Sequence, residues 1–208
     1  MSADIEIIRK SQQVTSKWSG GTTTELLIFP PNAEYAKRNF KWRLSSAKVE
    51  DEESVFTNLP GISRIIMILK GKLLLQHEGH HSVELKPFEQ DSFSGAWTTK
   101  SFGRVTDFNL MMAEGCAGNI EAIKIGTSRD LDLTFESVNG DFTDISEVLY
   151  CVEGQAEICI DDDKSLKLFE EDLVYIKTPI NEKGTKVKLY NIGDRELKII
   201  RATVYTAK

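Results

Sequence analysis

The sequence predicts an all-β protein made of two small barrels that arose by internal duplication. Short apolar runs bounded by Gly, Pro, Asn or Asp recur along the 208 residues, which is typical of strands. An apolar run that reaches a glycine and continues into a second apolar run occurs at residues 67–75 and again at 150–158. Each copy leads on to a Gln-Asp or Glu-Asp pair, at Asp91 and Asp172. A repeat of about this length in a strand-rich chain indicates a duplicated barrel.

The expected strands are runs of four or more mostly apolar residues that lie between turn-forming residues. Weak helical or turn character is confined to residues 32–39, and residues 113–130 resemble a connector between the two halves. We therefore expect a first barrel at residues 1–115, which could also take in strands from the C-terminus, and a second barrel at residues 116–208. In chain order, the strands are expected at residues 25–29, 41–49, 64–76, 105–112, 147–160, 173–176, 186–191 and 197–205.

Composition excludes several classes of function. The formal net charge of −6 does not favour a polyanionic partner, so nucleic acid is not expected as a ligand. Cys116, Cys151 and Cys159 show no CxxC spacing, so reduced thiols are expected in place of a disulfide framework or a zinc knuckle. The sequence contains no apolar stretch typical of a signal peptide or a membrane span, so a cytoplasmic protein without membrane contact is expected.

The duplicated strand-glycine-strand unit resembles the second half of a cupin barrel. In metal-binding cupins the pattern places a glutamate seven residues before the glycine, together with three histidines at set positions. Here the glutamate position holds Arg64 in the first repeat and Glu147 in the second, and no histidine falls on the other positions. A metal site needs several nitrogen, sulfur or carboxylate ligands that converge on one point. We therefore expect both barrels to lack a metal, and no cofactor is expected.

Arg64 is the most informative of these replacements. Strand alternation places Arg64 on the same face as Ile66 and Ile68, inside the barrel. A buried guanidinium offers five donors and keeps its charge, so it needs an anionic partner. Glu25 and Asp107 are candidates within the protein, and the carboxylate of a ligand is the alternative.

Further polar residues stand at strand spacing near this position. Arg43 and Ser45 share one face of their strand, opposite Trp42 and Leu44. Asp107 and Asn109 share one face of another strand. A third segment joins an aromatic residue to two glycines, three hydroxyls and a carboxylate, and reads Trp18-Ser19-Gly20-Gly21-Thr22-Thr23-Thr24-Glu25.

These segments resemble the HutD/Ves family of bicupins, in which each half is a double-stranded β-helix, or jelly-roll-like barrel. The family pattern has five motifs that occur here in the same order between Trp18 and Met112. The segment after Trp18 departs from it, because Ser-Gly-Gly-Thr stands where the family has an asparagine and three glycines. The other four motifs are Trp-Arg-Leu-Ser from Trp42, Pro-Gly-x-x-Arg up to Arg64, Leu-x-Gly up to Gly71 and Asp-Phe-Asn from Asp107.

The resemblance implies a protein linked to histidine utilisation or stress response, without an established catalytic activity. It suggests that the chain senses or buffers a small carboxylate such as formylglutamate or urocanate. Under this hypothesis Arg64 binds the carboxylate and other residues orient the ligand or form the wall of the site. These other residues are Arg43, Asn109, Asp107, Glu25, Trp18, Trp42, Thr24 and Ser45.

Two alternatives remain open. The chain could be a metal-independent isomerase or hydrolase in which Glu25 or Asp107 is the general base and Arg64 stabilises a developing negative charge. It could also be an interaction protein with packed barrels, in which Arg64 is paired internally. The second barrel is expected to be structural, and the exposed sheets are compatible with a homodimer.

The three histidines of the chain stand together, at His77, His80 and His81. With Glu78 they could bind a divalent ion. The sequence places them at the tip of a turn between two strands, outside the barrel, so two exposed polar turns are the simpler interpretation.

Overall fold

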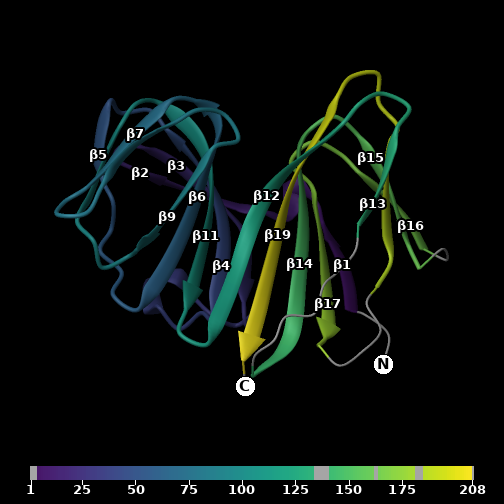
Figure 1. The fold of residues 1–208 in the computed structure, drawn as a ribbon, viewed down its shortest axis with the longest axis horizontal. Coiled ribbons are helices and arrows are strands. Elements are labelled where there is room, and N and C mark those ends of the chain that lie inside the picture. The colour runs from purple at the N-terminus through teal and green to yellow at the C-terminus, as the bar shows by residue number, and fades with distance from the viewer. Residues whose placement is uncertain (1–3, 134–140, 162–163, 181–184, 208) are drawn as a thin grey trace. The chain divides into compact units, whose positions relative to one another are not determined.

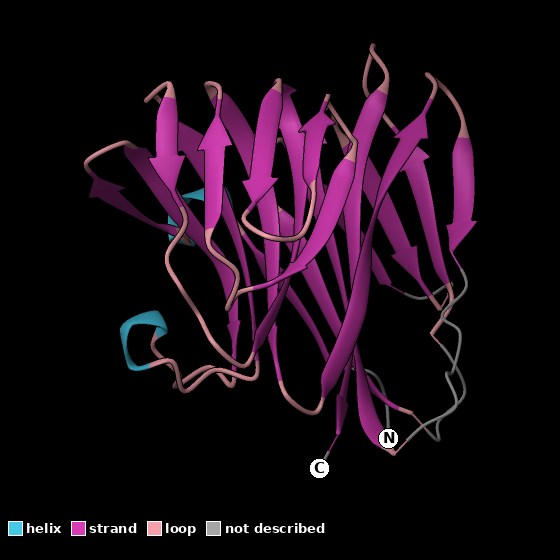
Figure 2. Cartoon of the chain, turned by 60° about the vertical axis from the view of Figure 1, so that its left-hand side comes forward, coloured by secondary structure: helices cyan, strands magenta, loops and turns pink. Residues whose placement is uncertain are grey.

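The computed structural model describes residues 4–133, 141–161, 164–180 and 185–207. It divides into two compact units, which we describe separately. Residues 13–116 form the N-terminal barrel, and the described residues up to Gln12 join those from 117 onward in the C-terminal barrel. The described part of the chain consists of antiparallel strands joined by loops, as expected from the sequence (Figure 1; Figure 2).

Each barrel consists of two sheets. In the described residues of the N-terminal barrel, the larger sheet has the order β2-β3-β4-β11-β6-β9 and the smaller one β5-β10-β7-β8. The bounds of the larger sheet are β2 (Val14–Trp18), β3 (Gly21–Phe29), β4 (Trp42–Val49), β11 (Val105–Ala113), β6 (Ile62–Gly71) and β9 (Gln90–Ser94). Those of the smaller sheet are β5 (Glu53–Val55), β10 (Thr99–Phe102), β7 (Leu73–His77) and β8 (Ser82–Leu85).

The C-terminal barrel repeats this plan. Its described strands form one sheet in the order β1-β17-β14-β19-β12 and a second in the order β13-β18-β15-β16. The first sheet contains β1 (Asp4–Ile8), β17 (Leu173–Pro179), β14 (Phe142–Glu153), β19 (Leu197–Ala207) and β12 (Cys116–Ile125). The second contains β13 (Asp130–Leu133), β18 (Val187–Asn191), β15 (Ala156–Ile160) and β16 (Lys164–Leu168).

The core of each barrel lies between its two sheets. In the N-terminal barrel, Ile66 and Ile68 of β6 pack with Leu73 and Leu75 of β7 in one buried cluster. The cluster of the C-terminal barrel likewise draws side chains from both sheets, including Leu149, Ile199, Ile158 and Leu189. Burial of this apolar area, at roughly 25 cal/mol per Å², is the main force that holds the sheets of each barrel together.

The two landmark glycines stand where the chain passes from one sheet to the other. Gly71 ends β6 with a φ of 88°, and Gly154 follows β14 with a φ of 97°. Glycine adopts these left-handed values without the steric cost that a Cβ brings. The runs expected as single strands at residues 64–76 and 147–160 are therefore each broken into two strands.

The predicted division of the chain differs from the structure at its N-terminus. Residues 1–12 were assigned to the first barrel, but β1 pairs antiparallel with β17, and Ile5 and Ile7 pack against the C-terminal core. Residues 113–130 were interpreted as a connector, whereas β12 is a ten-residue strand at the edge of the first sheet of that barrel. Both segments alternate apolar and polar residues, which suits an edge strand with one buried face.

Helical structure is minor in the described residues. It consists of two 3₁₀ turns, Lys10–Gln12 and Tyr35–Lys37, and the second lies in the segment for which turn or helical character was predicted. Neither turn has the length or the apolar character that crossing a membrane requires.

Candidate functional site

Polar side chains gather on the inner face of the larger sheet of the N-terminal barrel. Met111 of β11 lies opposite both Arg43 of β4 and Arg64 of β6. In the same way, Asn109 lies opposite both Ser45 and Ile66. Residues directly opposite one another in a sheet point to the same face, and the buried Ile66 identifies this face as the inner one.

Arg43 has an anionic, a polar and an aromatic partner within the protein. Its Nε donates to Glu25 Oε2 at 2.7 Å, and its Nη1 donates to Ser45 Oγ at 3.1 Å. The Tyr35 ring lies under the guanidinium, with 4.4 Å between Arg43 Cζ and the ring centroid. Glu25 thus pairs with Arg43, although the sequence suggested it as a partner for Arg64. The side chain of Glu25 is 34% exposed, so this end of the polar cluster reaches solvent.

Arg64 lies in a different environment. Arg64 is 6% exposed, and its guanidinium packs against two neighbouring rings, with 4.8 Å from Cζ to the centroid of Phe56 and 5.1 Å to that of Phe93. Its buried Nε has no hydrogen-bond partner within the described residues. Burial lowers the pKa of Arg64 to about 10 although Asp107 is near, and the side chain remains a cation at neutral pH.

Asp107 and Asn109 lie beside these arginines on β11 and are both buried. The backbone N–H of Ala47 donates to Asp107 Oδ1 at 3.2 Å. Burial raises the pKa of Asp107 to about 7, against the effects of this hydrogen bond and of Arg64. The Oδ1 atom of Asn109 is buried and has no hydrogen-bond partner within the described part of the chain. An unsatisfied buried acceptor costs about 1–3 kcal/mol, which a ligand with a hydrogen-bond donor would offset.

Three residues suggested from the sequence lie away from this cluster. Trp42 alternates with Arg43 along β4, so its fully buried ring lies on the opposite face, stacked on Phe29 at 5.6 Å. Thr24 also points to that face, where its hydroxyl contacts Thr15 Oγ1 at 2.8 Å. Trp18 is 39% exposed, and its Nε1 donates to Thr23 Oγ1 at 3.1 Å. The apolar wall of the site is formed instead by Phe56, Phe93 and Tyr35.

The corresponding position of the C-terminal barrel carries a paired charge. The sequence suggested no partner for Glu147, but Arg201 of β19 donates to both of its carboxylate oxygens, each at 2.9 Å. The Thr203 hydroxyl donates to Glu147 Oε2 at 2.9 Å, and Arg201 also donates to Glu121 at 3.0 Å. Burial raises the pKa of Glu147, and Arg201 opposes this effect. The C-terminal barrel thus satisfies its buried charge internally.

The position of His77 differs from its prediction. His77 is 3% exposed and points into the N-terminal barrel, where its ring lies 4.6 Å from that of Phe93. His80 and His81 are exposed, as expected for a turn. Burial lowers the pKa of His77, although Asp91 accepts a hydrogen bond from its ring. The burial of His77 could have been predicted from strand alternation. His77 stands two residues after Leu75 and four after Leu73, so its side chain points to the same buried face.

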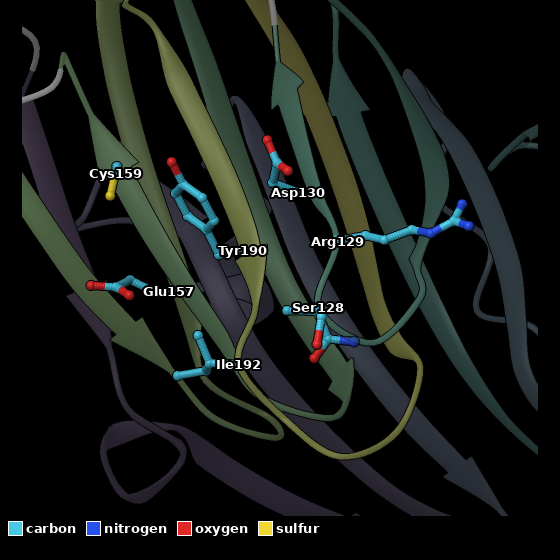
Figure 3. Close-up of a pocket in the computed structure, with 8 residues that line it drawn as sticks. Ser128, Arg129, Asp130, Glu157, Cys159, Tyr190 and Ile192 are labelled. Carbon is cyan, nitrogen blue, oxygen red and sulfur yellow. The ribbon is translucent and has the colours of Figure 1, made fainter.

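A surface hollow on the C-terminal barrel is a weaker candidate (Figure 3). Tyr190 and Glu157 are directly paired across β18 and β15, and they point away from the core residues Ile158 and Leu189. The carboxylates here already have partners, since Lys188 pairs with Asp130 at 2.8 Å and the Ser165 hydroxyl donates to Glu157. The hollow is lined by Ser128, Arg129, Asp130, Glu157, Cys159, Tyr190, Asn191 and Ile192.

Comparison with known proteins connects these observations to a family. The HutD family model matches residues 10–191. The chain belongs to the HutD family. A curated relative, an uncharacterized 21.2 kDa protein in the hutC 3′ region of Pseudomonas putida, is 31% identical over 117 residues. That match spans 53% of this chain and 60% of the relative, which is less than two thirds of its length.

Solved structures show that this HutD family chain has a cupin fold. A conserved protein of unknown function from Pseudomonas aeruginosa PAO1 has a TM-score of 0.79 at 20% identity and covers 99% of this chain and 100% of its own. HutD from Pseudomonas fluorescens SBW25, solved in a formate condition, has a TM-score of 0.65 at 19% identity over 96% and 98% of the two chains. Bacillus subtilis oxalate decarboxylase, a bicupin, has a TM-score of 0.65 at 9% identity over 97% and 77%.

Proposed function

We propose that the N-terminal barrel binds a small carboxylate on Arg64, without the help of a metal ion. The observation that carries the proposal is the difference between the two barrels at one position of the repeat. In the C-terminal barrel, the buried charge of Glu147 is paired by Arg201 through two hydrogen bonds. In the N-terminal barrel, the buried Nε of Arg64 lacks a hydrogen-bond partner within the described residues. A buried guanidinium that lacks a hydrogen-bond partner favours the binding of an anion.

The groups around Arg64 favour a ligand with a planar carboxylate and a hydrogen-bond donor. A planar carboxylate can accept two parallel hydrogen bonds from Nε and one terminal nitrogen of Arg64, which is the strongest arrangement for this pair. The rings of Phe56 and Phe93 pack against the guanidinium and exclude water from it. Asn109 Oδ1 requires a donor, so a ligand that carries an N–H or O–H group beside its carboxylate satisfies both orphaned groups. Formylglutamate has an amide N–H beside its α-carboxylate, and urocanate carries an imidazole N–H at the other end of a vinyl group.

Membership of the HutD family supports a biological setting for this proposal. The HutD match and the relative encoded near hutC both point to histidine utilisation, in which small carboxylic acids are intermediates. We propose that the chain senses or buffers such an acid, in the cytoplasm, with a regulatory role in histidine utilisation or in a stress response. Formate was present in the conditions used for HutD of Pseudomonas fluorescens, and it is the smallest probe of this chemistry.

The proposal is tested by thermal unfolding in the presence of carboxylates and their neutral analogues. Formate, formylglutamate, urocanate and glutamate are compared at constant ionic strength, with formamide as the uncharged match for formate. A carboxylate at a hundred times its Kd stabilises the protein by about 2.7 kcal/mol, which raises the Tm by about 5–10 °C for a chain of this size. An equal response to formamide, or no response to any of the acids, would contradict the proposal.

Asp107 should make this binding depend on pH. Its pKa is about 7, and its charge acts on Arg64. An anion on Arg64 is repelled by ionised Asp107, so the bound ligand raises the pKa of Asp107 above its ligand-free value of about 7. Affinity should therefore rise as the pH falls toward about 7 and should level off below it. The increase should be at most about tenfold per pH unit, because one proton is taken up.

Calorimetric titration with formate across this pH range measures the effect, and Asp107→Asn is the matched variant, because it removes the titrating group and keeps the shape. The variant should bind formate with little change over the same range. An affinity that rises with pH, or a pH dependence that survives in Asp107→Asn, would show that Asp107 does not face the bound anion.

A metal-independent enzyme is the second candidate, and the pKa of Asp107 is the observation that favours it. A carboxylate that titrates near 7 suits a general base, and Arg64 is the cation that would stabilise a developing negative charge. The same Asp107→Asn variant distinguishes the two functions. A binding protein retains its ligand without turning it over in either form, whereas an enzyme converts the acid and loses that turnover in the variant.

A further inference from the structure

We propose that His77, His81 and Asp91 form a binding site for a divalent transition-metal ion, separate from Arg64. The site lies at the edge of the N-terminal barrel, where β7 and β9 meet the turn that follows β7. None of the three residues falls at a ligand position of the cupin pattern, in which Arg64 takes the place of the glutamate.

The ligand atoms already converge. His77 Nε2 lies 2.9 Å from Asp91 Oδ2, and His81 Nε2 lies 3.1 Å from each carboxylate oxygen of Asp91. One ligand atom from each residue falls within 4.8 Å of the others. Zinc bonds of about 2.0–2.2 Å at tetrahedral angles place neighbouring ligand atoms roughly 3.3 Å apart. A small outward shift of the side chains therefore makes room for the ion.

The backbone holds the two histidines in place. The N–H of His77 donates to the carbonyl of His81 at 2.8 Å, and the N–H of His80 donates to the carbonyl of His77 at 3.0 Å. His77 is also paired in register with Thr99 of β10. Asp91 is fixed independently, since β9 pairs with β6 opposite Ile66. Ligands from a rigid sheet and a closed turn have little conformational entropy to lose when they bind an ion.

A second shell supports the tautomer that a metal needs. His77 Nδ1 lies 2.8 Å from Thr99 Oγ1, and the Thr99 hydroxyl donates to the Trp97 carbonyl at 3.4 Å. Without a metal ion, the ring proton of His77 lies on Nε2 and is donated to Asp91. An ion that binds at Nε2 releases a proton to solvent, and the neutral ring then keeps its proton on Nδ1, where the Thr99 oxygen can accept it while its own hydroxyl points to Trp97. Metal-bound histidines are usually held by such a hydrogen bond on their other ring nitrogen.

The surroundings leave one side of the site open. The ring of Trp97 lies 5.5 Å from that of His77 and 5.9 Å from that of His81, and Phe93 covers His77 from the interior. The side chain of His81 is 40% exposed. Two imidazoles and one carboxylate with an open position toward solvent suit Zn²⁺, Co²⁺ or Fe²⁺. Ca²⁺ and Mg²⁺ prefer ligand sets made of oxygen alone, so they are disfavoured.

The test is a titration of the full chain, freed of bound metal and carrying no histidine tag, with Co²⁺ and Zn²⁺. Co²⁺ reports its ligands through its visible absorption, and Zn²⁺ binding is followed by calorimetry. We expect one ion per chain at micromolar protein concentration. His81→Ala and Asp91→Asn should each weaken binding by at least about 10–100-fold, the usual cost of losing a residue that only supports a ligand, and neither change removes a group from the apolar core.

His80→Ala is the matched control. His80 lies in the same turn and stacks on Trp97 at 3.7 Å, but it is not one of the three ligands. It should keep the affinity and the absorption spectrum of the parent chain. The proposal is overturned if no stoichiometric binding occurs, if His81→Ala and Asp91→Asn bind as tightly as the parent, or if His80→Ala weakens binding as much as they do.

Discussion

Replacing Arg64 by methionine should abolish the response to carboxylates while the ligand-free protein becomes no less stable. Methionine fills a similar volume against Phe56 and Phe93 and removes a desolvated charge that has no hydrogen bond at Nε within the described residues. The neighbouring Asp107, whose pKa is about 7, can become protonated when the cation is lost, so we expect a free energy of unfolding equal to that of the parent chain or higher. The loss of a buried charge-assisted pair should weaken formate binding by at least about 30-fold, that is, by 2 kcal/mol or more. Urea unfolding and calorimetric titration measure the two effects on the same samples.

The matched control is Arg104→Met in the same barrel. The side chain of Arg104 is 65% exposed and forms a surface ion pair with Glu52 at 3.1 Å. Surface pairs of this kind contribute about 0–1 kcal/mol, so stability and formate affinity should both stay close to those of the parent chain. If Arg64→Met destabilised the empty protein by several kcal/mol, Arg64 would have a structural role that the proposed binding function does not include.

The opposite result is expected in the C-terminal barrel. Arg201→Met should lower the free energy of unfolding by about 3–5 kcal/mol, because it leaves the carboxylate of Glu147 buried without its partner. The pair has two hydrogen bonds of 2.9 Å, and the side chain of Glu147 is only 3% exposed. Urea unfolding at neutral pH measures the loss, and the double variant with Glu147→Met should recover most of it.

Arg195→Met is the control for this change. Arg195 forms ion pairs with Glu153 and Glu170 in the same barrel, but its side chain is 54% exposed. Its replacement should cost no more than about 1 kcal/mol. Equal effects of the Arg195 and Arg201 variants would mean that Arg201 does not compensate a buried charge.

Much of the fold follows from periodicity in the sequence. The apolar runs around Met67 and Tyr150 become long central strands, and Gly71 and Gly154 mark where the chain changes sheet. The edge strands β1 and β12 were not predicted because neither contains a run of four apolar residues, the signal on which the expected strands were based. Their identity depends on pairing with a strand far away in the chain, which a local pattern does not contain.

The polar cluster was partly predictable in the same way. Alternation places Arg64 with Ile66 and Ile68 on an inner face, as in the structure, and it places Arg43 and Ser45 on one shared face, which the structure shows to be the inner one. Which acid pairs with which arginine depends on the reach of side chains across the sheet, so the pairing of Glu25 with Arg43 came only from coordinates. The burial of His77 could have been inferred because it stands two residues after the buried Leu75 in the same strand. The polar residues that follow it led instead to the prediction of an exposed turn.

The most direct measurement is a crystal structure of this chain determined in formate and again in chloride. The formate crystal should show planar density beside Arg64, within hydrogen-bond distance of Nε and one terminal nitrogen, and the chloride crystal should lack it. An Arg64 that is paired with Asp107 in both crystals, with no density for formate, would contradict carboxylate binding in this barrel.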